Sequence, residues 1–372
     1  MTDILPFLKS IISVSGVSGL ETPVAKLIEE KWRPLVDETR ISRVGSLHGL
    51  KKGTSTLRHS FQSQGGAALG TGSGKSPRPS LMIAAHMDAI GMRVTKITDG
   101  FLHITNVGGI DVRVLPGAQV TVHANSGEEL PAVIAMPSAK LLPESVGNAV
   151  LEINYLLVDT GLTPREVEKK VRVGDLVSFA NEPLELAGEV VSGHTMDNRA
   201  SVAALTVCLE ELQSKTHVWD VWAVATVQEE TSYLGASGSA FELRPQIAIA
   251  VDGTFAKVSG MDDWRTHPLG KGVGLCMGPN MHPFLHTKLK ELAEKLEIPW
   301  FLDVTPVHSY TDAYPMQTTA EGIPTALVEF PIRYMHTPVE LVSVKDIQRA
   351  GRLLAEFIIS LEIDFVETII WE

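Results

Sequence analysis

Cysteine, aromatic residues and positive charge are all scarce in this chain of 372 residues. Its 2 cysteines, Cys208 and Cys276, are too few for a disulfide framework, and neither belongs to a Cys-x-x-Cys pair that would indicate zinc binding or redox chemistry. Lysine and arginine total 32 against 44 acidic residues, and the net charge of −12 repels phosphate backbones and anionic lipid headgroups. We therefore expect neither nucleic acid nor a membrane surface as a partner.

Long hydrophobic runs are also missing. His, Asp or Glu interrupts each apolar stretch well before the roughly 18 residues that are needed to cross a bilayer. The first residues include Asp3 and Lys9 and lack the basic leader of a secretory signal. Together with the cysteine usage, these patterns predict a cytoplasmic protein. The length predicts two or three domains with a large buried core.

What the sequence does contain is a series of short, continuous apolar runs typical of strands that are covered on both faces. Helical patterns separate these runs, and strands that alternate with helices predict an α/β layered domain. The four clearest runs are residues 81–86, 221–227, 247–251 and 326–330.

The region between residues 99 and 189 has a different pattern. Short Val-rich pieces alternate there with Gly, Pro and Asn turns, which predicts a small β-rich domain inserted into the α/β domain. The two parts of the α/β domain are then residues 1–98 and 190–372. Between Lys51 and Pro79 the chain is rich in Gly, Ser, Gln and Thr, which predicts a mobile surface loop and not a domain boundary.

Ionisable residues stand where the predicted strands end. His86 and Asp88 follow the first run, Glu229 and Glu230 the second, and Asp252 the third. His336 comes shortly after the fourth run, and Asp197 lies at the start of a predicted helix. Because ligands bind outside the carboxyl ends of strands in open α/β sheets, we expect these groups to converge.

Histidine with carboxylates and no thiolate is a ligand set that suits zinc, cobalt or manganese. Two divalent ions about 3.5 to 4 Å apart need a bridging carboxylate, for which Asp197 is the candidate. His86 and Asp252 complete one predicted site, and Glu230 and His336 complete the other. Asp88 is placed to accept the second N–H of the His86 ring, and Glu229 is left free as a general base.

Each of these residues also has an ordinary structural interpretation. A histidine at a strand end is often a hydrogen-bonded core residue, and two adjacent glutamates often lie in a solvated loop. Asp197 could cap its helix, and Asp252 could belong to a turn. The joint occurrence of such groups at one edge is what favours a metal centre.

At these residues the sequence resembles the TET-type di-zinc aminopeptidases, the glutamyl and deblocking aminopeptidase family. Similar motifs run in the family's order along nearly the whole chain: SGVSG (15–19), AHMDAIGMRV (85–94), NVGGIDVRVLPG (106–117), MDNRA (196–200), VQEE (227–230), AIAVDGT (248–254), TDA (311–313) and PIRYMHTPVE (331–340). By position, the family's metal ligands fall on His86, Asp197, Glu230, Asp252 and His336. The bridge falls on Asp197 and the catalytic base on Glu229.

The resemblance implies a three-layer mixed-sheet metallopeptidase domain with an inserted β-barrel or PDZ-like dimerisation domain. It also implies two divalent ions per subunit, zinc with cobalt or manganese as alternatives, and dimers that assemble into a tetrahedral dodecamer. The sequence departs from the family at residues 231–234 and at Ser309 and Tyr310, which predicts a reshaped substrate pocket.

These features predict a metal-dependent aminopeptidase that removes N-terminal residues from peptides. Two alternatives stay open on the sequence. One is a glycoside hydrolase of the endoglucanase kind, although its pair of carboxylates would have no use for two histidines and a bridging aspartate. The other is a non-catalytic, peptide-binding scaffold, although such a protein would be expected to lose ligands that are all present here.

Overall fold

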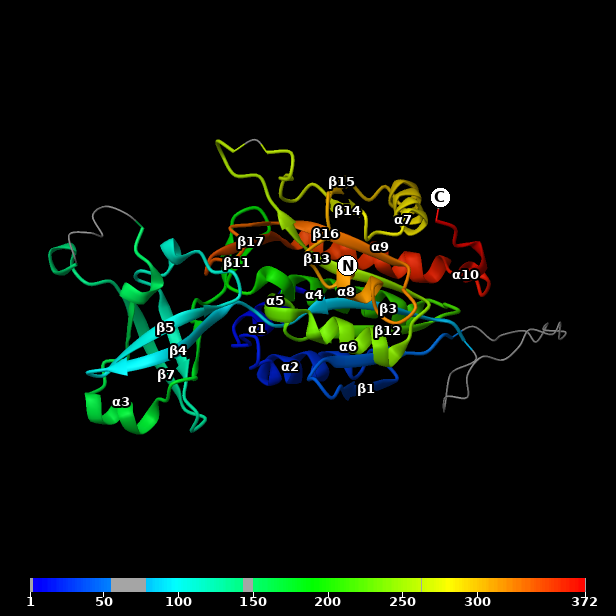
Figure 1. Ribbon diagram of the computed structural model, residues 1–372. Coiled ribbons are helices and arrows are strands. Elements are labelled where there is room, and N and C mark those ends of the chain that lie inside the picture. The colour runs from blue at the N-terminus through cyan, green and yellow to red at the C-terminus, as the bar shows by residue number, and fades with distance from the viewer. Residues whose placement is uncertain (1–2, 55–77, 143–149, 262, 372) are drawn as a thin grey trace.

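The computed structural model describes residues 3–54, 78–142, 150–261 and 263–371 (Figure 1). The loop predicted between Lys51 and Pro79 therefore falls largely outside the described residues. Among the helices that are described, none has the length and apolar character required to span a bilayer.

An eleven-stranded mixed sheet is the centre of the larger part of the molecule. Four neighbouring parallel strands confirm the four predicted runs: β12 (Asp220–Thr226), β3 (Ser80–His86), β13 (Ile247–Phe255) and β16 (Thr325–Arg333). Because these strands are parallel, their carboxyl ends meet at one edge of the sheet. The remaining strands are β1 (Glu38–Ile41), β2 (Leu47–Lys51), β10 (Leu184–Leu186), β11 (Val190–Gly193), β14 (Val273–Met277), β15 (Trp300–Val304) and β17 (Glu340–Ser343).

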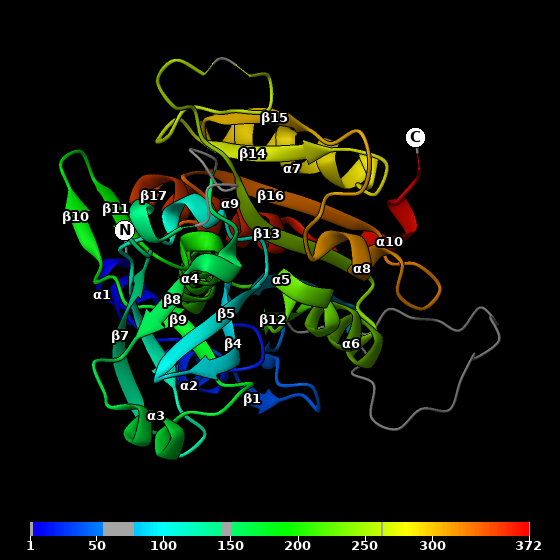
Figure 2. The ribbon, with the colours of Figure 1, turned by 60° about the vertical axis from the view of Figure 1, so that its left-hand side comes forward.

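Helices cover both faces of this sheet, so the predicted three-layer α/β arrangement is confirmed. Successive side chains of β13 point to opposite faces, with Ile249 packed in one apolar cluster and Ala250 in the other. One layer contains α1 (Leu5–Ile12), α2 (Thr22–Trp32), α4 (Met196–Glu211), α7 (Pro283–Lys295) and α9 (Val344–Ser360). The other contains α6 (Leu234–Leu243) and α8 (Ala313–Gln317), while α5 (Glu229–Ser232) lies at the sheet edge and α10 (Phe365–Thr368) near the C-terminus (Figure 2).

Helix α4 is buried along almost its whole length and circumference, which is unusual for a helix in an outer layer. The amphipathic helix α9 packs beside it in the same layer and also contacts β14, β16 and β17. This burial fixes α4, and with it Asp197 at its N-terminal end, relative to the strand ends.

The predicted small β-barrel is also confirmed, and it stands to one side of the sheet domain (Figure 1). Alternate residues of β7 point inward, so that Leu130, Ala132 and Ile134 pack in a separate apolar core. The six antiparallel strands close in the order β4 (Gly91–Thr98), β5 (Phe101–Val107), β8 (Leu157–Asp159), β7 (Glu129–Ala135), β6 (Gln119–His123) and β9 (Leu176–Phe179), with α3 (Pro164–Lys170) beside them.

The limits of the barrel differ from the boundaries predicted at residues 99 and 189. Its first strand already begins at Gly91, and its last ends at Phe179. The following strand, β10, pairs with β11 and belongs to the main sheet. The alternation of apolar and polar residues is the same in both sheets, so the pattern alone does not tell which sheet a strand joins.

Candidate metal centre

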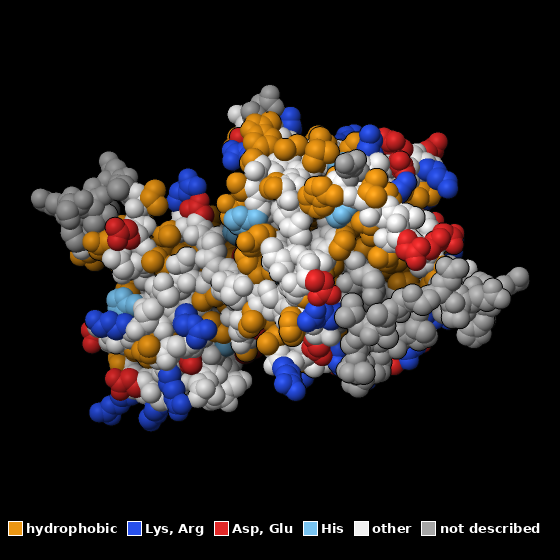
Figure 3. Space-filling view, turned by 45° about the vertical axis from the view of Figure 1, so that its right-hand side comes forward, with side chains coloured by type: hydrophobic (Ala, Val, Ile, Leu, Met, Phe, Trp, Pro, Cys, Tyr) orange, Lys and Arg blue, Asp and Glu red, His pale blue; other side chains and the backbone are white. Residues whose placement is uncertain are grey.

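A cavity of about 620 Å³ opens at the carboxyl ends of the central strands. Apolar side chains gather beside it at the top of the sheet domain, next to the projecting segment around residue 260 (Figure 3). Six of the seven predicted site residues line this cavity: His86, Asp197, Glu229, Glu230, Asp252 and His336. The seventh, Asp88, is completely buried behind it.

Three of these side chains form a first group of possible metal ligands. The Nε2 atom of His86 lies 3.2 Å from Oδ1 of Asp197 and 3.9 Å from Oδ1 of Asp252. One ligand atom from each of the three residues lies within 4.8 Å of the others. All three side chains are buried, and their nitrogen and oxygen donors suit a borderline divalent cation.

A second group shares Asp197 with the first. The Nε2 atom of His336 lies 3.3 Å from Oδ2 of Asp197 and 3.5 Å from Oε2 of Glu230. Ligand atoms of these three residues also lie within 4.8 Å of one another. Asp197 thus turns one oxygen toward each group, which is the arrangement that a bridging carboxylate requires.

Asp88 holds the segment that carries the two glutamates. Its carboxylate accepts hydrogen bonds from the backbone N–H of Glu229 (2.9 Å) and of Glu230 (3.3 Å), and from the hydroxyl of Ser18. The Nδ1 atom of His86 lies 3.2 Å from the main-chain oxygen of Asp88 and 3.5 Å from its carboxylate. Asp88 is therefore an anchor for α5 as much as the predicted acceptor for the imidazole.

Glu340 is a residue that the sequence reasoning missed. Its carboxylate accepts one hydrogen bond from the backbone N–H of Asp197 (3.0 Å) and another from that of His336 (2.7 Å). It is 2% exposed. It fixes the two segments that deliver these ligands, and the only sequence signal was its place four residues after His336.

Arg199 is a second residue that was missed. Its guanidinium group is completely buried and donates to the main-chain oxygens of Met87 (3.0 Å) and Ile11 (2.5 Å), which ties α1 and the end of β3 to the start of α4. A Cβ atom added to Gly16 would lie 2.1 Å from this group, so the glycine is needed for space. Burial lowers the pKa of Arg199 to about 9, which still leaves it charged at neutral pH.

The barrel also contributes to the site. The turn after β5 brings Gly109 to the wall of the cavity, where an added Cβ atom would lie 3.0 Å from Nδ1 of His336. At Gly108, which has a φ of +78°, an added Cβ would lie 3.3 Å from a carboxylate oxygen of Glu230. Side chains at these two positions would crowd the second ligand group.

The electrostatics of the cluster are those of carboxylates packed too closely to ionise together. Burial, and then repulsion by Asp197, raise the pKa of Glu230 to about 8. Burial also raises the pKa of Glu229 and of Asp252 well above the ordinary values. Burial alone would lower the pKa of His336, but its hydrogen bond to Asp197 and the charge of Glu230 raise it to about 10. Two bound divalent cations would supply the positive charge that these carboxylates need in order to be ionised together.

Known proteins are similar to this chain in fold and in sequence. Residues 66–353 match the sequence model of the M42 glutamyl aminopeptidase family. The lysyl aminopeptidase of Pyrococcus furiosus is 30% identical over 93% of this chain and 94% of its own length. An aminopeptidase from the archaeon Desulfurococcus kamchatkensis has a similar structure, with a TM-score of 0.86 and 31% identity over 98% of this chain and 97% of that one. The TET1 peptidase of Pyrococcus horikoshii superposes with a TM-score of 0.78 and 26% identity over 96% of this chain and 100% of that one.

Proposed function

The chain belongs to the M42 glutamyl aminopeptidase family and is a metal-dependent aminopeptidase, and we propose that it hydrolyses peptides from their N-terminus at a centre of two divalent cations. The observation that carries the two-cation centre is that Asp197 belongs to both groups of possible ligands. In this proposal His86 and Asp252 hold one ion, Glu230 and His336 hold the other, and Asp197 binds both.

The donor set fits such ions. It consists of imidazole nitrogens and carboxylate oxygens, which suits zinc and also accepts cobalt or manganese. When bound, ions of this kind polarise the scissile carbonyl group and make water acidic enough to attack it at neutral pH.

Glu229 is the proposed general base. It lines the cavity and is 8% exposed, and its Oε2 atom lies 3.7 Å from Nε2 of His86, but neither ligand group needs it. In this role Glu229 takes a proton from the attacking water and passes it to the leaving amine. The hydrogen bond from its backbone N–H to Asp88 keeps α5 in place during this transfer.

The test is hydrolysis of a panel of aminoacyl chromogenic substrates after chelation and after refilling with zinc, cobalt or manganese. We expect chelation to abolish peptidase activity and refilling to restore it. A glycoside hydrolase would cleave cellulose-type substrates and keep that activity in the presence of the chelator. A scaffold would bind peptides without cleaving them under any of these conditions, and either result would contradict the proposal.

The environment and assembly of the enzyme are also part of the proposal. Both cysteines are free and buried, which supports a reducing cytoplasm. The TET1 peptidase of Pyrococcus horikoshii can assemble into a tetrahedron or a large octahedral shell, and another similar structure is a dodecamer. Both support a homo-oligomer for this chain, which we propose to be a tetrahedral dodecamer built from dimers. Size-exclusion chromatography with light scattering tests the assembly, because a stable monomer would contradict it.

A further inference from the structure

Two carboxyl groups in the cavity are not needed for the metal centre. Glu329 of β16 is the register partner of Asp252 on β13, so the two side chains share one face of the sheet. Asp303 lies two strands beyond Glu329, on β15. The two carboxyl groups are neighbours, because burial, and then the charge of Asp303, raise the pKa of Glu329 well above its ordinary value. Both residues line the same cavity as the proposed metal ligands. The second pair of acids therefore begins one strand away from the first ligand group.

The polar partners of this pair leave one oxygen atom unused. Asp303 accepts a hydrogen bond from the hydroxyl of Thr254 (2.5 Å), and its other oxygen lies 3.5 Å from Nε2 of His267. Glu329 is 6% exposed, and its Oε2 atom is buried without a hydrogen-bond partner among the described residues. The thiol of Cys276, on β14, is the other polar group beside this carboxyl group. A carboxyl group that lines a substrate cavity and has an oxygen without a partner indicates a donor that arrives with the substrate.

Charge indicates which kind of donor this is. The carboxylates of Asp197, Glu230, Asp252 and Glu229 would offset the charge of two divalent ions. Among the described residues that line the cavity, the one arginine is Arg265, and it is paired with Asp263 at 2.7 Å. Even when one proton is shared between them, Glu329 and Asp303 leave an excess of negative charge, and a cationic group would complement this charge and allow both acids to ionise.

The rest of the cavity wall suits a long side chain. Phe255, Trp264 and Tyr310 line it and are more than half exposed. Aromatic faces pack against an aliphatic stem and attract a cation that passes over them. Lysine combines such a stem of four carbons with a terminal ammonium group, and arginine carries a guanidinium group that can bind a carboxylate with two hydrogen bonds.

We infer that Glu329 and Asp303 form a subsite for the cationic side chain of an N-terminal lysine or arginine, so that the enzyme prefers peptides with a basic first residue. This inference rests on the proposed aminopeptidase function and specifies its substrate class. Glu329 and Asp303 act here as specificity-determining residues. They take no part in the transfer of protons.

The experiment measures kcat/KM of the zinc-loaded full chain for lysyl, arginyl, leucyl and glutamyl chromogenic substrates. We expect the lysyl and arginyl substrates to exceed the leucyl substrate by at least about tenfold and the glutamyl substrate to be the poorest. Glu329→Gln and Asp303→Asn should each lower the lysyl-to-leucyl ratio by about tenfold or more. Glu291→Gln, which changes an exposed carboxylate on α7, is the matched control and should leave the ratio unchanged.

Three outcomes would overturn the inference. One is a wild-type enzyme that prefers leucyl or glutamyl substrates, and this measurement decides even if a variant fails to fold. Another is an unchanged ratio in both folded variants. The third is an equal loss for all four substrates in Glu329→Gln, which would assign this group to the α-ammonium group that every substrate shares. The absence of hydrolysis of any substrate would contradict the proposed function itself, so the two failures are distinguishable.

Discussion

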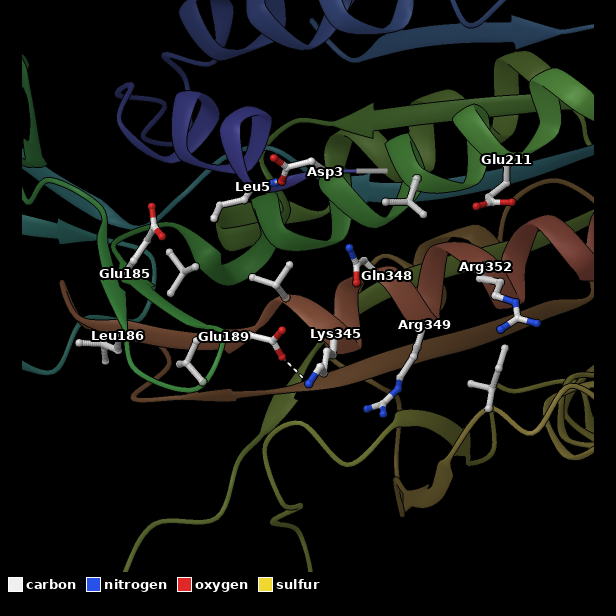
Figure 4. Close-up of a pocket in the computed structure, with 15 residues that line it drawn as sticks. Asp3, Leu5, Glu185, Leu186, Glu189, Glu211, Lys345, Gln348, Arg349 and Arg352 are labelled. Atoms are coloured by element: carbon white, nitrogen blue, oxygen red, sulfur yellow. Dashed lines mark hydrogen bonds and ion pairs between the residues drawn. The ribbon is translucent and has the colours of Figure 1, made fainter. Parts of the chain in front are cut away.

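Two cavities of nearly equal size differ in what lines them. The metal-centre cavity measures about 620 Å³, and a second cavity of about 660 Å³ lies among α1, β10, β11, α4 and α9. The second cavity also has charged walls, but Lys345 is paired there with Glu189 (Figure 4). Arg349 donates to Asp346 and to the main-chain oxygen of Gly270.

The difference shows that a functional site is better recognised by the burial of its charged groups, and by the elements that supply them, than by the volume of its cavity. In the second cavity, Lys345 and Arg349 lie on successive turns of one helix, and both ions of the Lys345–Glu189 pair are more than half exposed. In the first, buried and half-buried groups from β3, β13, α4, α5 and the segment after β16 converge within a few ångströms. Such an arrangement is unfavourable without bound cations, and it is therefore the mark of a functional site.

Asp197→Asn should have the largest effect on the metal-centre cavity. The variant loses the carboxylate that both ligand groups share, so we expect loss of both ions and a fall in turnover of more than about ten-thousandfold. Metal content by elemental analysis and kcat on an aminoacyl substrate measure the two effects. Glu211→Gln in the second cavity is the matched control and should retain metal and activity. Two ions per subunit in Asp197→Asn would contradict the bridging role.

Glu229→Gln should separate metal binding from catalysis within the first cavity. The amide keeps the shape of the side chain but cannot accept the proton, so kcat should fall about a hundred- to ten-thousandfold. The ligand groups do not include Glu229, so metal content and thermal stability should stay near the wild-type values. Turnover close to that of the wild type would exclude Glu229 as the base.

Glu340→Gln should have a smaller effect, on affinity for the metal. Glutamine offers one acceptor oxygen where Glu340 uses two, so either Asp197 or His336 loses its backbone anchor. We expect metal affinity to fall about ten- to a hundredfold and kcat to recover at saturating metal. Competition with a chelator measures the affinity, with Glu189→Gln in the second cavity as the control. A loss of kcat that added metal does not restore would indicate a role beyond positioning.

Much of the metal-centre cavity was predictable because its proposed ligands follow apolar runs directly. His86 ends β3, Asp252 lies within the carboxyl half of β13, and parallel strands bring such positions to one edge. The α/β layers and the β-rich insertion followed from periodicity in the same way. These signals are local, and each can be found within about ten residues of sequence.

The groups that support the ligands gave no such signal. Glu340 and Arg199 act through backbone atoms of distant segments, and such contacts depend on how α1, α4 and β17 pack. Glu329 sits inside an apolar run, where the pattern indicated only a buried strand. Glu329 lies near Asp303 because β16, β14 and β15 are neighbours in that order, and the hydrophobic periodicity of a sequence does not predict strand order.

A buried histidine outside both cavities shows how burial alters the pKa of an imidazole when no carboxylate cluster surrounds it in the described part of the chain. His48 on β2 is as buried as His86, but its ring contacts the hydroxyl of Ser239 (2.9 Å), and among the described residues no carboxylate cluster lies beside it. Burial, and then the charge of Arg40, lower the pKa of His48 to about 4. The unfolded chain binds this proton near pH 6.5, so the stabilisation is complete above that pH and is lost as the pH falls toward 4.

Between pH 7 and pH 5 this single group should therefore lower the free energy of unfolding by about 2 kcal/mol. His48→Gln removes the titration and keeps a polar side chain at the same place. Urea unfolding of the metal-free wild type and variant at both pH values isolates the effect, because all other groups titrate equally in the two proteins. Between pH 7 and pH 5 the wild type should lose that amount of stability relative to the variant. Parallel pH profiles would contradict the prediction, because they would show that the pKa of His48 is the same in the folded and the unfolded chain.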